Sequence, residues 1–555
     1  MGLRTGAEVL VDCLRAQGVT TAFGVPGESY LAVLDALIGS GIRMVANRHE
    51  GGAAFMAEAW GKLTGEPGVC FVTRGPGATN ASIGVHTAMQ DSTPMVLFIG
   101  QIETGGRDRE LFQEVDYRAF FGPIAKWATE IDRADRVPEI LARAFAVARS
   151  GRPGPVVVAL PEDMLAAATA AGAGPPVRVP MAAPAAEDIA ELRDLLAQAR
   201  RPLVLAGGGG WGAAGRAGLR AFAEANALPV ATVWRYTDLL DNASPSFVGT
   251  AGLGKTASVR ELMLGADLIL ALGIRFGEIT TDNYALYPPP RMTARLVHAH
   301  ASDGELNKIY TADLAVHAHP DRLLPALAAL RVDAGAWAER TEAARAAWLA
   351  ELETPPQPGA VDMGAVTRRL AEVLPDDAIL TNGAGNFSIW PNKHFPFTGG
   401  RRLLAPQSGA MGYGLPAAIA AKIARPEATV VCYAGDGDFQ MTEAELATAA
   451  QASAPIVVLL VNNGGYGTIR MHQERHYPGR VSFTELANPD FAAMARSFGM
   501  LGERVERTGD FPAALARALA SPTGAVLDLA VDIEALTPRA SLSAIRDAAL
   551  KESKA

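Results

Sequence analysis

Gly435-Asp436-Gly437 is followed, after 24 residues, by Asn462-Asn463, and together these residues could hold a cation and a phosphate. Asp436 offers a carboxylate, Asn463 an amide oxygen, and the glycine-rich loop after Asn463 a free backbone carbonyl. Such oxygen ligands suit Mg²⁺, which usually completes its octahedron with phosphate oxygens and water. Glycines also let backbone N–H groups approach a phosphate closely. Gly-Asp-Gly alone is typical of an ordinary turn, but Asn-Asn at this spacing favours a binding site.

The segments around these residues predict a strand, a helix and a second strand. Residues 428–434 and 455–461 are apolar runs of the kind that form buried strands. Thr442 and Glu445 have the spacing of a capping box, which predicts a helix start. Strand, helix and strand in this order form a right-handed unit with parallel neighbours. Asp436 and Asn463 should therefore lie at the carboxyl edge of a sheet, where open α/β sheets bind ligands.

This pattern resembles the binding motif of thiamine diphosphate (ThDP)-dependent enzymes. The resemblance covers nearly the whole chain and is closest to the acetohydroxyacid synthase (acetolactate synthase) branch. It implies that Asp436, Asn463 and the carbonyl of Gly465 hold Mg²⁺, which anchors the diphosphate of ThDP. It also implies cofactor contacts from the neighbouring residues of both loops, which are Gly435, Gly437, Asp438, Phe439, Tyr466, Gly467 and Thr468.

A second cluster, Arg48-His49-Glu50, follows a predicted strand and precedes a helix rich in small residues. Taken alone, Glu50 is typical of a surface carboxylate that interacts with the helix dipole. The resemblance implies instead that Glu50 is the catalytic glutamate, which binds the N1′ atom of the aminopyrimidine ring and activates the cofactor. In such an enzyme the cofactor carries the difficult chemistry, and the protein positions and tunes it.

Further residues match the same branch. The resemblance implies that Gln113 lies beside the reacting carbon as a second catalytic residue, and Lys126 follows at the spacing of the branch. Gly409 would offer its carbonyl to the 4′-amino group, and Met411 would enforce the bent cofactor conformation, although Met is also a common core residue. The remaining cofactor contacts that the resemblance implies are Pro26, Gly27, Thr73, Pro76, Asn80, Gly385, Asn386 and Phe387.

Two departures from the branch leave the substrate and a second cofactor open. His472 stands where the synthases have a Trp that shapes the acceptor pocket, so it is either an acid/base group or a rim residue. Residues 249–259 and 273–284 resemble FAD-contacting segments with a changed acidic run, so this region is expected to bind FAD, another nucleotide or nothing. The glycine loop at 207–212 is weak evidence by itself. The two His-x-His pairs, at 298–300 and 317–319, are more typical of structural or surface residues than of a metal site.

The length of 555 residues predicts several domains, and two stretches rich in Ala, Pro or Gly, at about 165–187 and 353–361, resemble linkers. Alternating strands and helices between them predict three doubly wound α/β domains with mostly parallel sheets. We expect these domains at residues 1–168, 187–335 and 360–540. The resemblance implies that they are the pyrimidine-binding, central and diphosphate-binding domains.

The net charge of −9 argues against nucleic acid as a partner, and no apolar run is long enough to cross a membrane. The N-terminus reads as an amphipathic helix rather than a signal peptide. The three cysteines have neither metal-site nor disulfide spacing, which fits a reduced cytoplasmic setting.

The resemblance implies a ThDP- and Mg²⁺-dependent enzyme that acts on 2-oxo acids. The leading expectation is decarboxylation of pyruvate and carboligation to a carbonyl acceptor. The alternatives are a lyase, a 2-oxo acid decarboxylase or a dione hydrolase, and, from a different class, a non-catalytic ThDP- or nucleotide-binding protein. The resemblance also implies a homo-oligomer, at least a dimer and plausibly a tetramer, with active sites between subunits. The sequence leaves a regulatory subunit open.

Overall fold

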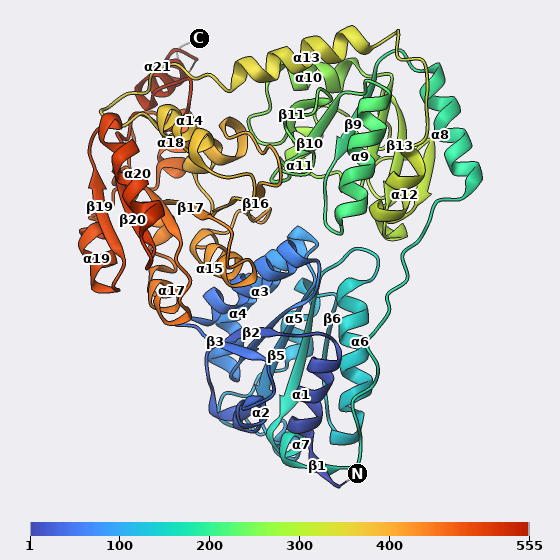
Figure 1. Ribbon diagram of the computed structural model, residues 1–555, viewed down its shortest axis with the longest axis vertical. Coiled ribbons are helices and arrows are strands. Elements are labelled where there is room, and N and C mark those ends of the chain that lie inside the picture. Colours follow the sequence, from blue (N-terminus) through green and yellow to red (C-terminus); the bar gives the residue numbers. More distant parts are fainter. Residues whose placement is uncertain (1, 553–555) are drawn as a thin grey trace. The chain divides into compact units, whose positions relative to one another are not determined.

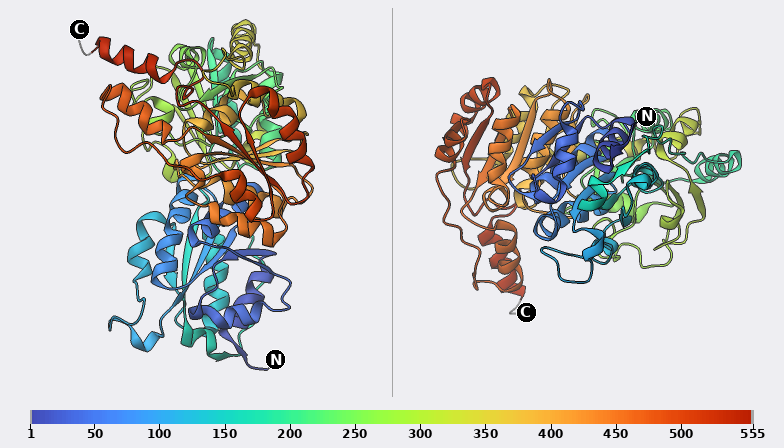
Figure 2. Two further views of the ribbon diagram at one scale, coloured as in Figure 1. Left: turned by 90° about the vertical axis from the view of Figure 1, so that its left-hand side faces the viewer. Right: turned by 90° about the horizontal axis from the view of Figure 1, so that it is seen from below.

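Three parallel six-stranded sheets, with helices on both faces, form the framework of the chain (Figures 1 and 2). The computed structural model describes residues 2–552, so Met1, the first residue of the predicted N-terminal domain, lies outside the described residues. Neighbouring strands pair in parallel throughout the three sheets. The predicted class of three doubly wound α/β domains is confirmed.

The first sheet has the order β3-β2-β4-β5-β7-β6. Its strands are β2 (Thr21–Gly24), β3 (Arg43–Ala46), β4 (Gly68–Val72), β5 (Met95–Gln101), β6 (Trp127–Glu130) and β7 (Pro155–Pro161). The main helices beside it are α1 (Gly6–Ala16), α3 (Glu50–Thr64), α4 (Gly75–Asp91) and α6 (Val137–Arg149). The predicted N-terminal helix is α1, which opens with a capping box because Glu8 N–H donates to Thr5 Oγ1 at 3.2 Å and Thr5 N–H donates to Glu8 at 2.7 Å.

The third sheet repeats the topology of the first. Its order is β16-β15-β17-β18-β20-β19, and when the strands of each sheet are numbered along the chain, both orders read 2-1-3-4-6-5. Its strands are β15 (Ile379–Asn382), β16 (Arg402–Leu404), β17 (Val430–Gly435), β18 (Val457–Asn462), β19 (Leu501–Val505) and β20 (Ala525–Ala530). Its helices include α14 (Met363–Val373), α18 (Gly467–His476), α20 (Phe511–Ala520) and α21 (Leu542–Glu552).

The second sheet has a different order, β11-β10-β9-β12-β13-β14. Numbered along the chain this reads 3-2-1-4-5-6, the order of dinucleotide-binding sheets. Its strands are β9 (Pro202–Ala206), β10 (Val230–Val233), β11 (Phe247–Ala251), β12 (Leu268–Leu272), β13 (Arg295–His300) and β14 (Leu314–His317). Its helices include α8 (Ala186–Gln198), α9 (Ala213–Ala225), α10 (Ala257–Gly265), α12 (Pro320–Leu327) and α13 (Ala338–Glu351).

The chain folds into two compact units that do not follow the order of the sequence. Unit 1 comprises residues 1–180, 406–427 and 439–456, and it contains the first sheet together with α15 (Gly414–Ala424) and α17 (Leu446–Ala452). Unit 2 comprises residues 181–405, 428–438 and 457–555, and it contains the second and third sheets. Within unit 1, α15 lies beside α3 (Figure 1). The rings of Phe55 and Tyr413 meet edge to face there, with 5.5 Å between their centroids. Helix α15 is apolar on all sides and almost wholly buried, as expected for a helix inside a core.

The predicted capping box at Thr442 is wrong, although a helical segment does begin there. A 3₁₀ turn at Glu443–Glu445 leads into α17, and the Thr442 side chain does not cap it. The Thr442 hydroxyl donates instead to the carbonyl of Gly412 at 2.8 Å. The Glu445 carboxylate accepts hydrogen bonds from the N–H groups of Arg48 and His49 at the start of α3, as well as from the Thr448 hydroxyl of α17.

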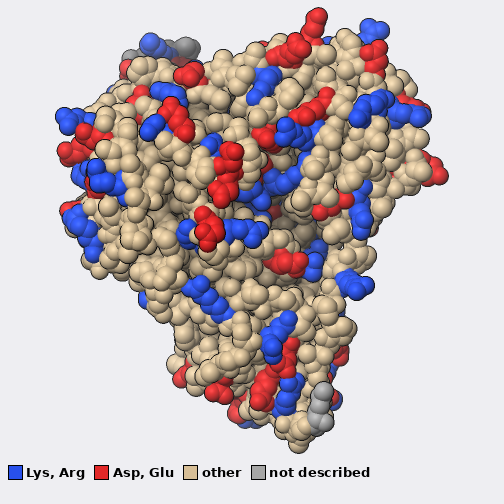
Figure 3. Space-filling model, in the orientation of Figure 1, with Lys and Arg blue, Asp and Glu red and all other residues tan. Residues whose placement is uncertain are grey.

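Basic and acidic side chains are intermixed over the face of the molecule drawn in Figure 3. In the part of the chain that the structure describes, no helix is both long and apolar enough to cross a membrane. Cys13, Cys70 and Cys432 are buried free thiols.

Candidate active site

The predicted metal ligands of unit 2 come together where two neighbouring strands end. β17 and β18 pair in parallel with Gly435 opposite Val461, so Asp436 and Asn463 follow adjacent strand ends. The N–H of Gly465 donates to both the Asp436 carboxylate and the Asn463 amide oxygen, at 3.2 Å each. The carbonyl of Gly465, the third predicted ligand, accepts from Gly467 N–H at 2.8 Å. One carboxylate, one amide oxygen and one carbonyl thus lie close together, a donor set that a hard cation prefers.

Asp436 is almost fully buried, with 2 % of its surface exposed. Burial raises the pKa of its carboxyl group, and hydrogen bonds from Asn488, Gly437, Gly464 and Gly465 oppose that rise. These N–H groups are neutral, whereas a metal ion carries a full positive charge. A bound cation would supply that charge and favour the ionised form.

Asn488 is a residue of this edge that the sequence did not predict. Its amide donates to Asp436 at 2.7 Å and to the Asn462 side chain at 2.9 Å. Asn462 in turn donates to Asp528 at 2.9 Å, and Arg504 forms an ion pair with Asp528 at 2.8 Å. Asp528 is fully buried within β20, and a carboxylate inside an apolar strand was the visible signal for this network.

The predicted glycines of unit 2 make room for aromatic rings. A Cβ atom on Gly435 or Gly385 would lie 2.7 or 2.6 Å from the ring of Phe387, and one on Gly437 would lie 2.5 Å from Tyr466. Gly467 is equally confined, by Leu536 at 2.5 Å. These close approaches pack the loops that follow β15, β17 and β18 against one another.

Three more predicted residues of this edge have identifiable partners. Asn386 accepts a hydrogen bond from the Thr468 hydroxyl at 2.9 Å, so these two residues are brought together. Asp438 is buried and accepts from Ala384 N–H at 3.1 Å, which ties the loop after β17 to the loop after β15. Phe439 is buried and belongs to unit 1, whereas the preceding predicted residues of this loop, 435–438, belong to unit 2.

Glu50, the predicted catalytic residue, is the first residue of α3 in unit 1. The side chain of His49 caps this helix by accepting from Gly51 N–H at 3.0 Å. The Glu50 carboxylate accepts from the Asn80 amide at 3.0 Å, and a Cβ atom on Gly77 would lie 3.3 Å from it. Glu50 and Asn80, both predicted site residues, therefore meet near the starts of α3 and α4, and Pro76 is an exposed residue in the otherwise buried first turn of α4.

The other predicted residues of unit 1 lie on loops at the ends of strands or helices. Gly27 touches Thr73, since a Cβ atom on Gly27 would lie 2.5 Å from Thr73 Cβ, and Pro26 is exposed beside it. Gln113 has a left-handed backbone (φ 65°), and its carbonyl accepts from Gly75 N–H at 3.1 Å. Gly409 (φ 65°) and the half-buried Met411 lie on a loop whose Ser408 hydroxyl is 3.0 Å from the Thr87 hydroxyl of α4.

Lys126 and His472, which the sequence singled out, differ in their surroundings. Lys126 is bound by the carbonyls of Val147 (2.5 Å) and Ser150 (2.7 Å) at the C-terminus of α6, and burial lowers its pKa to about 8. This is a helix-capping arrangement. His472 is exposed on α18, and its ring stacks on that of His476 with 6.1 Å between centroids. The pKa of His472 is lowered, mainly by partial burial and further by electrostatic repulsion from Arg475 and His476.

The central sheet offers mixed support for a nucleotide site. At the N-terminus of α9, where this strand order places a pyrophosphate, the Asp321 carboxylate accepts from Gly212 (2.9 Å) and Gly215 (2.8 Å). The two segments that resemble FAD contacts do meet, because Lys255 binds the Asp282 carboxylate. Asp282, Asn283 and Tyr284 are consecutively left-handed, and such strained backbone is most often found at functional sites.

The His-x-His pairs are engaged with the backbone. His298 lies 3.0 Å from the carbonyl of Ile274, and His317 lies 3.1 Å from that of Ala301. His319 caps α12 by accepting from Asp321 N–H at 3.2 Å. Across residues 2–552, no group of three or more His, Cys, Asp or Glu side chains is placed to hold a metal ion.

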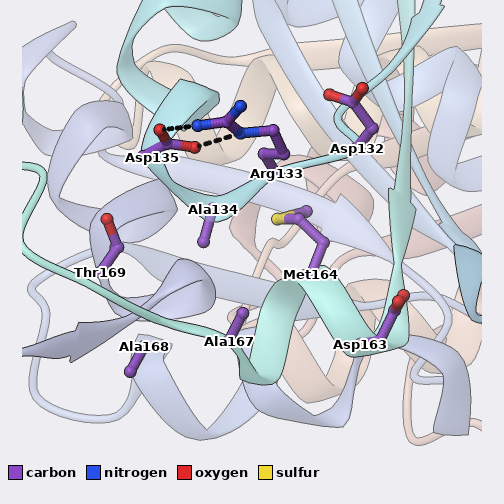
Figure 4. A pocket seen from close by; sticks show the side chains of 9 residues that line it. All are labelled: Asp132, Arg133, Ala134, Asp135, Asp163, Met164, Ala167, Ala168 and Thr169. Atoms are coloured by element: carbon purple, nitrogen blue, oxygen red, sulfur yellow. Dashed lines mark hydrogen bonds and ion pairs between the residues drawn. The ribbon is translucent and has the colours of Figure 1, made fainter.

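A pocket of about 290 Å³ opens elsewhere in unit 1, beside β8 (Ala168–Thr169) (Figure 4). None of its lining residues is a predicted site residue. Its charged groups are satisfied within the protein, since Arg133 pairs with Asp135 and Asp163 accepts from Thr104. We assign this pocket no part in the site.

Comparisons with known proteins agree with the three α/β sheets of the fold. Family models match residues 4–120 (thiamine pyrophosphate enzyme, N-terminal TPP binding domain), 189–327 (central domain) and 383–529 (C-terminal TPP binding domain). The chain is 33% identical to the acetolactate synthase isozyme 2 large subunit of Escherichia coli (strain K12) over 530 residues, 95% of each chain. It is 34% identical to the acetolactate synthase large subunit of Parasynechococcus marenigrum (strain WH8102) over 558 residues, 95% of this chain and 87% of that protein.

The chain therefore belongs to the thiamine pyrophosphate enzyme family, and it is a ThDP-dependent enzyme. Within that family it belongs to the branch of the acetolactate synthase large subunits. A probable acetolactate synthase large subunit of Methanocaldococcus jannaschii is 31% identical over 547 residues, 95% of this chain and 92% of that protein.

Proposed function

We propose that the protein is a ThDP- and Mg²⁺-dependent carboligase that removes CO₂ from pyruvate and joins the remaining unit to a carbonyl acceptor, as in acetolactate synthesis. The observation that carries the proposal is the cluster of Asp436, Asn463 and Gly465 at adjacent strand ends, in a chain that matches acetolactate synthases over 95% of its length. The three domains are proposed at residues 1–168, 187–335 and 360–540, as pyrimidine-binding, central and diphosphate-binding domains.

Asp436, Asn463 and the Gly465 carbonyl would hold Mg²⁺, and a carboxylate, an amide oxygen and a carbonyl are oxygen ligands that fit that ion. When bound, ThDP supplies a nucleophilic carbon and an electron sink for a 2-oxo acid that loses CO₂. Glu50 would hold a proton at the pyrimidine ring, with Asn80 fixing the carboxylate. Gln113 would orient the reacting groups, and Met411 would hold the bent cofactor.

The remaining contacts to ThDP are proposed on the loops of the two units. In unit 1 they come from Pro26, Gly27, Thr73, Pro76 and Gly409. In unit 2 they come from Gly385, Asn386, Phe387 and the loops after β17 and β18. The proposed assembly is a homodimer or homotetramer with shared active sites, in the cytoplasm.

The deciding experiment is incubation of the purified protein with ThDP, Mg²⁺ and pyruvate, followed by identification of the products. We expect CO₂ and acetolactate, and no reaction without Mg²⁺. Free acetaldehyde as the sole product would favour a decarboxylase, and a product formed only with an added aldehyde would favour a lyase. Absence of any product with every 2-oxo acid tested would contradict the proposal.

FAD is the second cofactor to test, since the contact of Lys255 with Asp282 and the strained segment 282–284 support a ligand site in the central domain. A flavin absorption spectrum of the purified protein should show bound FAD. A colourless protein that takes up no added FAD would exclude it.

A further inference from the structure

We propose that Glu445 is a positioning residue for Glu50, the catalytic group of the proposed function on which this inference rests. Glu445 lies on the turn that precedes α17, far from Glu50 in the sequence but in the same compact unit. Its carboxylate holds the backbone turn Asn47–His49, and that turn ends where Glu50 begins α3.

The Glu445 carboxylate accepts four hydrogen bonds, three from this turn and one from Thr448 of α17. Oε1 accepts from Arg48 N–H at 3.2 Å and from His49 N–H at 3.0 Å. Oε2 accepts from the Asn47 amide at 3.1 Å and from the Thr448 hydroxyl at 2.5 Å. The side chain is fully buried, so water cannot replace these partners.

Gly52 shows how closely the carboxylate approaches α3. A Cβ atom at position 52 would lie 2.3 Å from Glu445 Oε1, so any larger residue would push the carboxylate away. The N-terminus of a helix carries a partial positive charge, which a buried carboxylate stabilises. Glu445 therefore caps the start of α3, whereas a capping box would have capped the helix to which Glu445 itself leads.

The turn is also fixed on its other side. The Asn47 side-chain oxygen accepts from Gly24 N–H at 3.1 Å, at the end of β2. Glu50 follows His49 directly, and Asn80 binds its carboxylate. Displacement of this turn would shift Glu50 relative to its target atom, and a misplacement of about 1 Å can lower a rate by about 100-fold.

The test compares Glu445→Gln with Glu58→Gln as a matched control. Glu58 is equally buried in unit 1, on the same helix α3, but its partners are Tyr413 (2.5 Å), Thr93 (2.7 Å) and Lys62 (3.3 Å) rather than the turn. In Glu445→Gln the side-chain oxygen can still accept hydrogen bonds. The NH₂ group replaces the second oxygen, and it cannot accept from the donors that this oxygen bound.

The first measurement is amide hydrogen exchange of Arg48 and His49 in the cofactor-free protein. We expect exchange about ten-fold faster in Glu445→Gln, from the loss of charge-assisted hydrogen bonds, and unchanged in Glu58→Gln. Unchanged exchange in Glu445→Gln would overturn the structural half of the inference without involving ThDP.

The second measurement is exchange of the C2 proton of bound ThDP, together with kcat and KM. We expect Glu445→Gln to slow C2 exchange and kcat by roughly 10- to 100-fold, with KM and Mg²⁺ affinity nearly unchanged. If wild type and Glu50→Gln exchange this proton equally slowly, the proposed function fails. If wild type is fast, Glu50→Gln is slow and Glu445→Gln matches wild type, only the positioning role fails.

An equal loss of C2 exchange in Glu58→Gln would also overturn the inference, because it would show a general effect of altering buried carboxylates. Should Glu445→Gln not fold, Thr448→Val removes one donor to Glu445 without removing the carboxylate. It should slow C2 exchange by a smaller factor, and a wild-type rate in that variant would count against the proposal.

Discussion

Glu50 and Asp436 are carboxylates with opposite surroundings. Glu50 is half-buried at the start of a helix, where Asn80 binds it. Asp436 is buried at a strand end, and N–H groups surround it. The first arrangement suits a group that exchanges a proton, and the second suits a permanent anion beside a cation. Removing each charge should therefore have a different consequence.

Glu50→Gln should lower kcat by roughly 100- to 10,000-fold, because the amide cannot take part in proton transfer at the pyrimidine ring. Binding of ThDP and Mg²⁺ should stay within a few-fold of wild type, since Glu50 is not among the proposed metal ligands. Steady-state kinetics and calorimetric titration measure the two quantities. A variant with near-normal kcat would remove Glu50 from the mechanism.

Asp436→Asn should raise the Mg²⁺ concentration that gives half-maximal ThDP binding by about ten-fold or more, because the single anionic ligand of the cluster is lost. The variant preserves side-chain shape, so its thermal stability without cofactor should be close to that of wild type. Titration of the apoprotein with Mg²⁺ at fixed ThDP gives the result. Unchanged Mg²⁺ dependence would refute the metal assignment.

Local motifs predicted that Asp436 and Asn463 lie at one sheet edge, because strand ends and glycine loops can be recognised from residues adjacent in the sequence. Asn488 could not be placed in this way, since its contact with Asp436 depends on how the loop between α18 and α19 (Phe491–Ser497) folds back. Such a contact between segments far apart in the sequence leaves no local pattern.

At the scale of elements, the buried strands were predictable and most edge strands were not. β17 and β18 lie inside their sheet and are continuous apolar runs. β14, β16 and β19 lie at sheet edges, where they are short or partly exposed. An edge strand has a neighbouring strand on one side only and is more exposed to solvent, so its sequence does not need to be apolar throughout.

The two Thr-x-x-Glu motifs show the limit of a local rule. Thr5 and Glu8 form a capping box, whereas Thr442 and Glu445 have the same spacing and do not. α1 begins at an exposed position, so its first N–H groups depend on neighbouring side chains. α17 begins against α3, and tertiary partners there replace the local ones.

Glu58 on α3 should make stability depend on pH. Burial raises its pKa to about 7, against an ordinary value of 4.5, with Lys62 opposing and Asp91 adding to the rise. The folded protein then binds a proton that the unfolded chain releases above its ordinary pKa. The stabilisation is complete below that value and is lost as pH rises through about 7.

Glu58→Gln should remove this dependence, because the amide does not titrate. Between pH 5 and pH 8, wild type should lose stability relative to the variant by an amount on the order of 1–3 kcal/mol. Thermal melting of both proteins across that range gives the difference, from which the other titrating groups cancel. A constant difference between the two proteins would contradict a raised pKa at Glu58.

At the scale of the whole molecule, the first and third sheets share one strand order, and the second has another. Their likeness is visible in the sequence only as a common style of strands and loops. Glu50 lies in unit 1 and Asp436 in unit 2, and the proposed active sites combine such halves from two subunits.

Mixing two inactive variants tests this sharing. Glu50→Gln and Asp436→Asn chains, dissociated and reassembled together, should recover about a quarter of wild-type activity, since half of the random dimers are mixed and each holds one intact site. Each variant alone, treated identically, is the control. No recovery, despite mixed dimers identified by mass spectrometry, would show that each site is built from one chain.

Unit 1 is built from three separate stretches of the chain, which limits how the protein can be divided into fragments. A fragment that stops at residue 180 would lack α15 and α17, which lie in the stretches 406–427 and 439–456. Phe55 would lose Tyr413, and Arg48 and His49 would lose Glu445. The N-terminal segment is thus not an independent folding unit. A chimera that exchanges this segment must also exchange residues 406–427 and 439–456.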